Sequence, residues 1–283
     1  MNATAPSVDP DRAAHLRDRL DANNQTHLLV RAHLGIAPDP GAIRRIADFY
    51  HPPKWAVGCI GAVDALFLYD FVAGLRPDRV IEIGTAGGGS AAVLALAMHD
   101  ADLGQPGQPL VQTFDRHTHC YFDRSRPVGS AVREMLPSLA PRVRIHTHAT
   151  AIDAARLFAG RPVRLAFIDA DHRHPHPTAD LLALLPAIEP GGWVVLHDID
   201  LPTADARYEA QSGQRVTWHE HGAQYLFNAW PHEKIAGVGQ GANIGAIRIP
   251  DTGAVRAGDL ADLIDRPWEA EPDPLVRAIL ERG

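Results

Sequence analysis

The stretch "RVIEIGTAGGGSAAVLALAMHD", residues 79–100, joins a short apolar run to a glycine-rich turn and then to a second apolar run. The first run, 79–84, is rich in Val and Ile and is apolar on both faces, which predicts a buried strand. The second run, 89–101, is long enough to predict a helix. Small residues between them let backbone N–H groups approach a ligand closely. The stretch therefore predicts a ligand site where a strand becomes a helix.

The composition of this turn limits what the ligand can be. Its glycines do not have the G-x-G-x-x-G spacing, so the nicotinamide dinucleotide fingerprint is absent. Glu82 places a carboxylate at the end of the strand, where it would repel a pyrophosphate but favour a cationic ligand or a hydrogen-bond donor. The alternative is a tight strand-to-helix turn without a ligand.

Strands and helices alternate along the chain beyond this stretch. Further helices are predicted at 61–75, near 128–139, near 151–159 and at 178–188, and further strands at 110–115, 142–148, 163–169 and 191–198. Such alternation predicts an α/β fold with a parallel sheet covered on both faces. The last two predicted strands, 234–240 and 243–250, are too close together for a helical crossover, so we expect them to pair antiparallel.

The ends of the chain differ from this pattern. Residues 9–35 are predicted to be helical, and Pro38, Pro40 and the segment 50–55 punctuate the connection to the next part of the chain. We therefore expect an N-terminal helical appendage or lid over 1–55, a main domain over 56–254 and a C-terminal helical extension over 255–283.

The overall composition excludes several classes of partner. The chain has 283 residues, of which 46% are hydrophobic, so it can bury a full core. Its net charge of −7 argues against a nucleic-acid surface and favours a small-molecule partner. Two cysteines, Cys59 and Cys120, are too few for a disulfide framework, and no run of 18 apolar residues or signal pattern is present. We expect a soluble cytoplasmic protein that binds neither nucleic acid nor membrane.

The turn and the end of the sheet together resemble a known family. The pattern E-x-G-x-x-x-G-x-S at Glu82, Gly84, Gly88 and Ser90 resembles the first motif of the class I S-adenosylmethionine-dependent methyltransferases. It is most similar to the metal-dependent catechol and caffeoyl-CoA O-methyltransferases and to related bacterial natural-product methyltransferases. Over about 56–250, the resemblance implies a Rossmann-like fold: a seven-stranded, mostly parallel sheet with an antiparallel last strand and helices on both faces.

The resemblance also implies which residues bind S-adenosylmethionine. Asp115, at the end of the second strand, would accept hydrogen bonds from the ribose, although it could equally be a helix cap or a loop acid. Thr150 and Ala151 would border the adenine, although a threonine there could also cap a helix. The full set of expected cofactor-binding residues is Glu82, Gly84, Ala86, Gly88, Ser90, Asp115, Thr150, Ala151 and Asp169.

Two aspartates follow the fourth and fifth predicted strands. Asp169 and Asp198 should meet beyond the carboxyl ends of these strands, where they would repel each other unless a cation lies between them. In the resembling family these positions hold a divalent metal, with magnesium as the first expectation. The asparagine that follows the second aspartate in that family is Ile199 here, so the third ligand would be His197, Asp200 or water, unless no metal is bound. His197 would favour a softer ion. Without metal, Asp169 would contact the methionine part of the cofactor and Asp198 would cap a loop.

Several histidines surround these acids in the sequence. His172 aligns with the lysine general base of the catechol enzymes, and an imidazole can accept a proton near neutral pH. We expect His172 and Asp169 to be catalytic, the alternative for His172 being a bystander in a solvated loop. His174 and His176 are expected to have a surface role.

Aromatic residues after the fifth strand could line a substrate site. We expect Tyr225, Phe227 and Trp230 to be core, and Trp218, His219 and His221 to be candidates for substrate contact. Lys54 and Trp55 would close over the site from the N-terminal segment, or belong to an exposed linker.

The favoured function is methyl transfer from S-adenosylmethionine to a hydroxyl of a small molecule, a phenol or a specialised metabolite, assisted by a divalent metal. Three alternatives remain open: a metal-independent methyltransferase with a histidine base, a non-catalytic cofactor-binding or dimerisation protein of the same fold, and a hydride-transferring dehydrogenase. A homo-oligomer is expected, since homodimers are the commonest assemblies.

Overall fold

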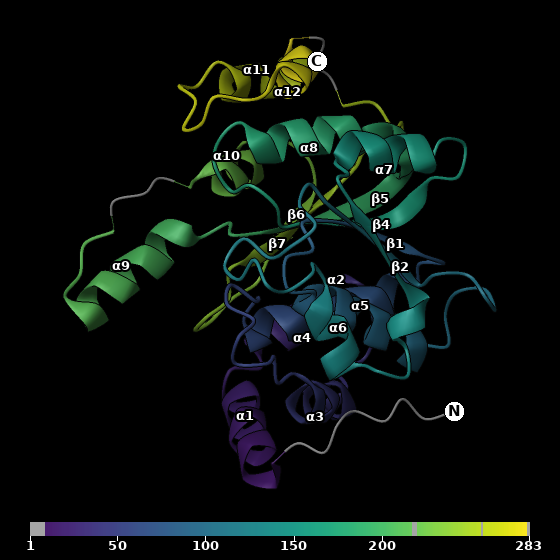
Figure 1. Ribbon diagram of the computed structural model, residues 1–283, viewed down its shortest axis with the longest axis vertical. Helices are drawn as coiled ribbons and strands as arrows, with labels where there is room; N and C mark the ends of the chain where they lie inside the picture. Colours follow the sequence, from purple (N-terminus) through teal and green to yellow (C-terminus); the bar gives the residue numbers. More distant parts are fainter. Residues whose placement is uncertain (1–8, 217–219, 256, 282–283) are drawn as a thin grey trace. The chain divides into compact units, whose positions relative to one another are not determined.

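The computed structural model describes residues 9–216, 220–255 and 257–281. In this part of the chain, seven strands form one sheet in the order β3-β2-β1-β4-β5-β7-β6 (Figure 1). The strands are β1 (Val80–Ile83), β2 (Val111–Asp115), β3 (Val143–Thr147), β4 (Val163–Ile168), β5 (Ile188–His197), β6 (Lys234–Ala236) and β7 (Ile244–Arg248).

Helices separate these strands along the chain, except between β6 and β7. They are α1 (Pro10–Ala22), α2 (Gln25–His33), α3 (Pro40–Phe49), α4 (Ala62–Leu75), α5 (Gly89–Asp100), α6 (Ser130–Met135), α7 (Ala151–Leu157), α8 (His176–Leu184), α9 (Leu201–Ser212), α10 (Gly222–Ala229), α11 (Ala257–Ile264) and α12 (Pro274–Leu280), with short 3₁₀ turns at Ala140–Arg142 and Leu185–Ala187. None of the described helices combines the length and the apolar character needed to cross a bilayer.

Strand pairing confirms the predicted fold class. β1 pairs parallel with β2, β2 with β3, and β4 with β5. β7 pairs antiparallel with β6 and also with β5. The connection from β6 to β7 is too short for a crossover helix, which forces the antiparallel hairpin that the sequence predicted.

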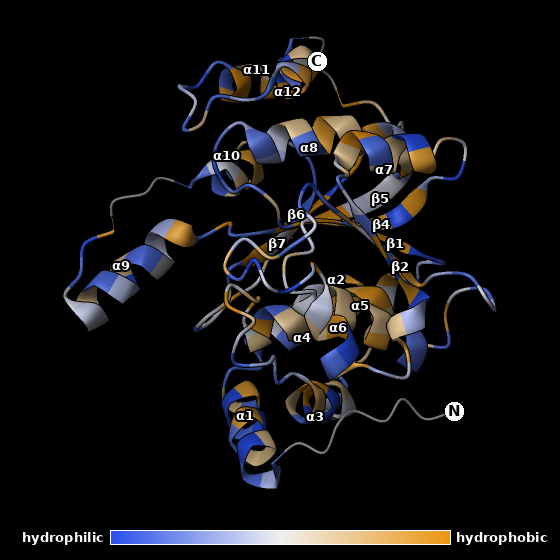
Figure 2. Ribbon diagram, in the orientation of Figure 1, coloured by the Kyte–Doolittle hydropathy of each residue, from blue (hydrophilic) through white to orange (hydrophobic). Residues whose placement is uncertain are grey.

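The chain divides into two compact units. The first comprises the described residues up to Ala149 together with Gly237–Ala242. Its core is formed by β1, which is buried along its whole length, and by α5, which is buried from Gly89 to Met98. α4 packs on α5, and α2 and α3 pack on α4 (Figure 1). Figure 2 contrasts the largely apolar α5 with α1, where apolar and charged residues are mixed.

A buried charge network fixes α2 to α4 within this first unit. The Asp70 carboxylate is fully buried. Its Oδ2 atom lies 2.7 Å from His27 Nδ1, and its Oδ1 atom lies 2.8 Å from Arg31 Nη1. The backbone N–H of Asp39 donates to His27 Nε2. Removing one partner from such a buried pair is costly, so the network anchors α2 to α4.

The second unit comprises Thr150–Ala236 and the described residues from Asn243 onward. Within it α8 packs on β4, α7 and α10 pack on α8, and α12 packs on the opposite side of α8 (Figure 1). β4 and β5 supply two neighbouring strand ends, and the residues that follow them carry the acids identified above.

Some predicted boundaries were wrong for identifiable reasons. The predicted helix over 9–35 is two helices, because it stops at Asn23 and α2 starts after Asn24. α3 was not predicted, because Pro40 was interpreted as a break. Proline in fact suits the first turn of a helix, where its missing N–H costs nothing, and the Asp39 side chain caps this turn through Gly41 N–H. β6 ends at Ala236, four residues before the predicted end.

Candidate active site

The glycine-rich turn after β1 adopts left-handed backbone conformations. Gly84 and Gly88 have φ values of 95° and 93°. A Cβ atom on Gly88 would lie 2.7 Å from Val132 Cγ2 and 3.0 Å from Gly129 Cα, so α6 leaves no room for a larger residue there. The backbone N–H groups of Gly129 and Ala131 donate to the carbonyls of Ala86 and Gly87. The turn is therefore held against the start of α6 in one conformation.

Asp115 joins the end of β2 to the same turn. Its Oδ2 atom accepts hydrogen bonds from the backbone N–H groups of Thr85, at 3.2 Å, and Ala86, at 3.0 Å. Its Oδ1 atom accepts one from His117 N–H at 2.8 Å. The carboxylate thus acts as a loop acid, as the alternative interpretation stated. A carboxylate has about four acceptor sites, so it can still accept bonds from a ligand hydroxyl.

The remaining predicted cofactor residues divide between the two units. In the first unit Glu82 and Ser90 are buried, and Ala86 has a φ value of 42°. In the second unit Thr150 is the N-cap of α7, and both its backbone N–H and its hydroxyl donate to Asp153 Oδ2. Ala151 is buried in the first turn of that helix. Thr150 therefore has a capping role in this structure.

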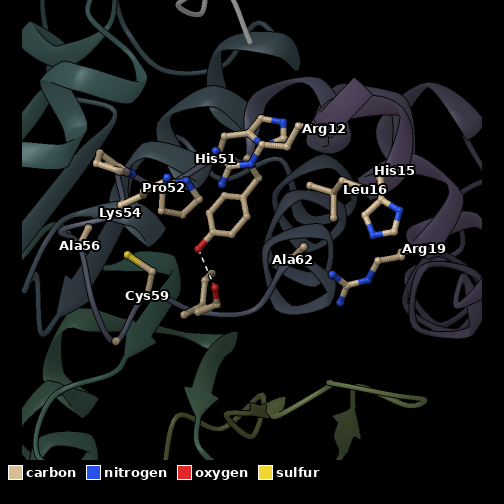
Figure 3. A pocket seen from close by; sticks show the side chains of 14 residues that line it. Arg12, His15, Leu16, Arg19, His51, Pro52, Lys54, Ala56, Cys59 and Ala62 are labelled. Atoms are coloured by element: carbon tan, nitrogen blue, oxygen red, sulfur yellow. Dashed lines mark hydrogen bonds between the residues drawn. The ribbon is translucent and has the colours of Figure 1, made fainter. Parts of the chain in front are cut away.

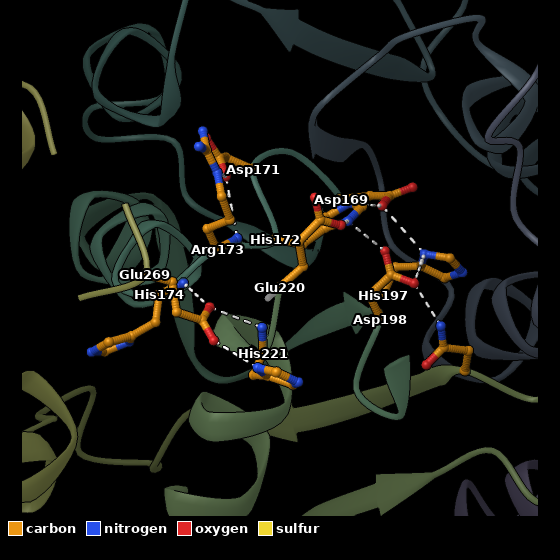
Figure 4. Close-up of polar contacts among 11 residues, drawn as sticks. Asp169, Asp171, His172, Arg173, His174, His197, Asp198, Glu220, His221 and Glu269 are labelled. Atoms are coloured by element: carbon orange, nitrogen blue, oxygen red, sulfur yellow. Dashed lines mark hydrogen bonds and ion pairs between the residues drawn. The ribbon is translucent and has the colours of Figure 1, made fainter. Parts of the chain in front are cut away.

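Two aspartates and two histidines form a compact group at the ends of β4 and β5. We call Asp169, His172, His197 and Asp198 the acid–histidine cluster (Figure 4). The His172 ring reaches both acids, with Nε2 3.3 Å from Asp169 Oδ1 and Nδ1 2.9 Å from Asp198 Oδ2. His197 Nδ1 lies 3.3 Å from an oxygen of each aspartate. The convergence of the two acids expected from the strand order is therefore present.

The electrostatics of the cluster favour charge separation. Burial lowers the pKa of His172, but hydrogen bonds with Asp169, Asp198 and Glu220 outweigh it and raise this pKa well above its ordinary value. Burial has the same effect on His197, and the charges of the two aspartates raise its pKa. Burial raises the pKa of Asp198, whereas His197 and His172 lower it. Two imidazolium groups thus supply the positive charge that adjacent carboxylates need.

The same side chains form a suitable donor set for a divalent cation. One ligand atom each from Asp169, His172 and Asp198 lies within 4.8 Å of the others. Mixed carboxylate and imidazole donors suit manganese, iron, nickel or zinc better than magnesium, which prefers oxygen alone. An imidazole must lose its proton to bind a metal, so a cation and the protons of the cluster would compete.

An asparagine reaches Asp198 from a distant part of the sequence. Asn243, just before β7, donates from Nδ2 to Asp198 Oδ1 at 2.5 Å and accepts a hydrogen bond from the backbone N–H of Asp200. Ile199, where the resembling family has asparagine, is instead buried and lies beside Gly245. Sequence reasoning missed Asn243 because its partner is 45 residues away and no local pattern marks the pair.

Glu220 is a second acid that the sequence did not identify. Its Oε2 atom lies 3.6 Å from His172 Nδ1, which places a third carboxylate beside that ring. Glu220 occurs in the run "WHEHG" between histidines, and this density of polar residues after a strand was its one available signal. Trp218 and His219, the neighbouring candidates for substrate contact, lie outside the described residues.

The loop that carries His172 is held by the C-terminal part of the chain. Glu269 Oε2 accepts hydrogen bonds from the backbone N–H groups of His174, at 2.7 Å, and His221, at 2.9 Å. Glu269 Oε1 lies 2.7 Å from His221 Nδ1 (Figure 4). A Cβ atom on Gly222 would lie 2.8 Å from His172 O, so α10 begins directly against this loop.

The expectation that His174 and His176 have a surface role was wrong. His174 is fully buried and His176 is 6% exposed. The polar, proline-rich sequence suggested a solvated loop, but the segment around Glu269 covers it, and the backbone N–H groups of Glu269 and Ala270 both approach His174 O. His221 contacts Glu269 and Tyr225.

Among the aromatic residues, Trp230 and Phe227 are buried, as the core prediction stated, and Tyr225 is partly exposed beside Arg266. Lys54 is exposed. Trp55 donates from Nε1 to Glu134 and lies under Arg126, which ties it to the neighbourhood of α6.

Comparison with known proteins agrees with this architecture. A family model described as a methyltransferase domain matches residues 81–199, which include the glycine turn and both aspartates. No curated protein matches the sequence. Among solved structures, the chain is similar to cofactor-bound Rv0187 from MTB, with a TM-score of 0.51 and 20% identity over 87% of this chain and 99% of that one.

The chain is also similar to a second solved structure. The O-methyltransferase from Bacillus cereus in complex with SAH has a TM-score of 0.47 and 19% identity, and the alignment covers 81% of this chain and 99% of that chain. These similarities concern the fold. Within this chain, residues 81–199 match the methyltransferase domain model, and the similarity to Rv0187 is one of fold.

Proposed function

We propose that the protein transfers the methyl group of S-adenosylmethionine to a hydroxyl oxygen of a small molecule with the help of a divalent cation. The observation that carries this proposal is the acid–histidine cluster at the ends of β4 and β5. It lies in a chain whose methyltransferase match ends at residue 199, directly after the second acid. Carboxylates and imidazoles at this position suit the binding and deprotonation of a hydroxyl group.

The glycine turn and Asp115 supply the proposed cofactor site of the first unit. S-adenosylmethionine, when bound, supplies an electrophilic methyl group on a sulfonium. The narrow turn at Gly84, Ala86 and Gly88 allows close backbone approach, with Glu82 and Ser90 beside it. Asp115 retains about one acceptor site for a ribose hydroxyl. In the second unit, Thr150 and Ala151 would border the adenine, and Asp169 would contact the methionine part.

Asp169, Asp198 and His197 are the proposed metal ligands, since His197 Nδ1 lies 3.3 Å from an oxygen of each aspartate. His172, which also lies within reach of both acids, is assigned the base role instead. A divalent cation, when bound, supplies positive charge that favours the deprotonated form of a hydroxyl group. Asn243 keeps Asp198 in place through its amide. The presence of His197 favours manganese, iron, nickel or zinc, while magnesium remains the ion of the resembling family.

His172 is the proposed general base. In the transfer, an oxygen–carbon bond forms, the sulfur–carbon bond breaks, and the hydroxyl proton passes to a nitrogen of the His172 ring. Asp169 and Asp198 raise the pKa of this ring and so favour its protonated form, which cannot accept a further proton. The ring can act as a base only when the negative charges of the two aspartates are offset. Methyl transfer otherwise depends on alignment of the reacting atoms and exclusion of water.

A metal-independent version of the same reaction is the second candidate. His172 is already oriented by two carboxylates, in the way that a catalytic base is oriented by an acid. In this version Asp169 and Asp198 would hold the imidazole without a metal.

The proposal also includes the assembly and setting of the protein. We propose an N-terminal lid over 1–55, a catalytic domain over 56–254 and a helical extension over 255–283. The charge of −7 and the two cysteines suit a cytoplasmic enzyme that works on small molecules as a homo-oligomer.

Metal withdrawal and labelled methyl transfer test the proposal together. The protein is treated with EDTA, desalted, and assayed with S-adenosylmethionine carrying a labelled methyl group against a panel of phenols and alcohols. We expect no transfer without metal and restored transfer on addition of manganese or magnesium. Full transfer without metal would favour the second candidate. Tight cofactor binding without transfer to any member of the panel would contradict both.

A further inference from the structure

The first unit contains a pocket that the proposed reaction does not use. Its volume is about 460 Å³, and it lies between α1 and the segment that leads from α3 to α4 (Figure 3). Residues of α1 and residues from Tyr50 to Ala62 line it. This volume is within the range of sites that accept a small molecule.

Nitrogen-bearing side chains dominate the polar part of this pocket. Arg12, His15 and Arg19 lie on one face of α1 at the spacing i, i+3, i+7, and His51 and Lys54 come from the facing segment. None of the described lining residues is acidic. In the described part of the chain, Arg12, Arg19 and Lys54 make no ion pair. The whole sequence has more acidic residues, 34 Asp and Glu, than basic ones, 27 Lys and Arg. The positive charge is therefore concentrated here and not neutralised.

His51 lines the same pocket and lies near Arg12. Its Nε2 atom donates to the Ala47 carbonyl at 2.7 Å, and Figure 3 shows its ring beside Arg12. Burial lowers the pKa of His51 and the nearby Arg12 guanidinium lowers it further, whereas the hydrogen bond to Ala47 and the Asp48 carboxylate act in the opposite direction. An anion placed between this guanidinium and the imidazole could accept charge-assisted hydrogen bonds, which would stabilise the bound anion.

The rest of the pocket wall is apolar. Leu16, Pro52, Pro53 and Ile60 contribute aliphatic surface, and the buried Tyr50 presents its ring while its hydroxyl donates to Ile60 O at 2.7 Å. A ligand that fits both the basic side chains and the apolar wall of the pocket has an anionic group and an apolar body.

The inner wall of the pocket touches the glycine-rich turn. Ala56 Cβ lies 3.4 Å from the position of a Cβ atom on Gly87, and Cys59 Sγ lies 3.0 Å from that on Gly89. Tyr50 Oη lies 3.6 Å from the same position on Gly89. A molecule in the pocket is thus separated from the proposed cofactor turn by a single layer of side chains.

We propose that this pocket binds a small molecule that carries an oxyanion group, a carboxylate or a phosphate ester. Arg12 and Arg19 bind the oxyanion, with Lys54 at the rim, and the apolar wall contacts the body of the molecule. The chief alternative occupant is the carboxylate of S-adenosylmethionine itself.

Binding of matched ligand pairs tests the proposal. The protein, loaded with S-adenosylhomocysteine, is titrated calorimetrically with 3,4-dihydroxybenzoate and its amide, and with 4-hydroxyphenyl phosphate and hydroquinone. We expect the anion of at least one pair to bind about tenfold more tightly than its neutral partner, as charge-assisted hydrogen bonds provide. The pair that shows the difference tells whether the group is a carboxylate or a phosphate.

Variants then locate the effect. The double variant Arg12→Gln with Arg19→Gln should abolish the preference for the anion, whereas Arg17→Gln, on the same helix but outside the pocket, should retain it. Arg12 and Arg19 are exposed, so folding should be unaffected, and melting temperatures check this. In the unaltered protein the preference should also shrink between about 0.05 and about 0.5 M salt, because exposed charges are screened.

The outcomes are separable. Equal binding within both pairs, or no binding by any member, overturns the subsite. Loss of S-adenosylhomocysteine affinity in the double variant, with the anion preference unchanged, assigns the arginines to the cofactor and also overturns it. Failure of the unaltered protein to bind S-adenosylhomocysteine at all contradicts the proposed function instead.

Discussion

Asp115 and Asp198 both follow or end a strand of the sheet, yet the structure holds their carboxylates in opposite ways. Asp115 accepts its hydrogen bonds from three backbone N–H groups, those of Thr85, Ala86 and His117. Asp198 is held by side chains, with His172 at 2.9 Å, His197 at 3.3 Å and Asn243 at 2.5 Å.

The difference indicates two kinds of site. Backbone N–H groups do not titrate, so the donors that hold Asp115 carry no charge that could be exchanged. Imidazoles carry positive charge only when protonated, so the surroundings of Asp198 can exchange protons for a cation. We therefore expect the first acid to affect cofactor affinity and the second to affect turnover and metal binding.

The largest effect is expected for Asp198→Asn. Loss of this charge leaves two imidazoliums facing one aspartate and removes a proposed metal ligand, so turnover should fall by about 10³-fold. Methyl transfer and manganese binding by calorimetry measure the effect. Asp265→Asn, which removes an exposed acid of the same unit, should change neither quantity. Normal turnover of Asp198→Asn would contradict a role for the cluster in the reaction.

A second, smaller effect concerns the choice of metal. His197→Asp replaces an imidazole with an oxygen donor, so activity with magnesium relative to manganese should rise about tenfold. Metal-stripped protein, assayed with each ion in turn, gives this ratio before and after the change. An unchanged ratio would show that His197 does not bind the ion.

Asp115→Asn should weaken cofactor binding and leave the rate of methyl transfer nearly unchanged. The amide cannot accept from all the donors that the carboxylate serves, so affinity for S-adenosylhomocysteine should fall about tenfold. Turnover at saturating S-adenosylmethionine should stay within about threefold of the unaltered protein. A selective loss of turnover would remove the distinction between the two acids.

The smallest effect is expected from the support of the His172 loop. Burial raises the pKa of Glu269, but hydrogen bonds from the N–H groups of His174 and His221 outweigh it and lower that pKa. Its contribution to stability is thus present above its unfolded-state pKa of about 4.3 and is lost as the pH falls through the lower folded-state value.

Glu269→Gln should therefore cost about 1–2 kcal/mol of unfolding free energy at pH 7, and the gap between the two proteins should narrow toward pH 3. Urea unfolding of both proteins across this range measures it. Glu271→Gln, which removes an exposed acid whose partner is Arg277 at the surface, is the matched control. A gap that widens on acidification would contradict a lowered folded-state pKa for Glu269.

The positions of these acids could be predicted from the sequence, because they follow from the order of the strands. Asp115, Asp169 and Asp198 each come at the end of an apolar run, and the carboxyl ends of such strands are where ligands bind in this class of sheet. The glycine turn was equally predictable, since glycine tolerates the positive φ values that this strand-to-helix turn adopts at Gly84 and Gly88.

The remaining parts depend on tertiary contacts that no local pattern encodes. Asn243 and Glu269 act on residues 45 and 95 positions away, through single hydrogen bonds whose geometry is set by packing. The burial of His174 was mispredicted for the same reason, because the segment that covers it lies far along the chain. The pocket beside α1 was also not predicted, since it forms only when α1 meets the segment after α3.

The most direct test measures S-adenosylhomocysteine affinity by calorimetry in the unaltered protein, in Asp115→Asn and in Asp198→Asn. The account predicts clear binding by the unaltered protein, about tenfold weaker binding by Asp115→Asn, and unchanged binding by Asp198→Asn. Absence of binding by the unaltered protein, or equal weakening by both substitutions, would contradict it.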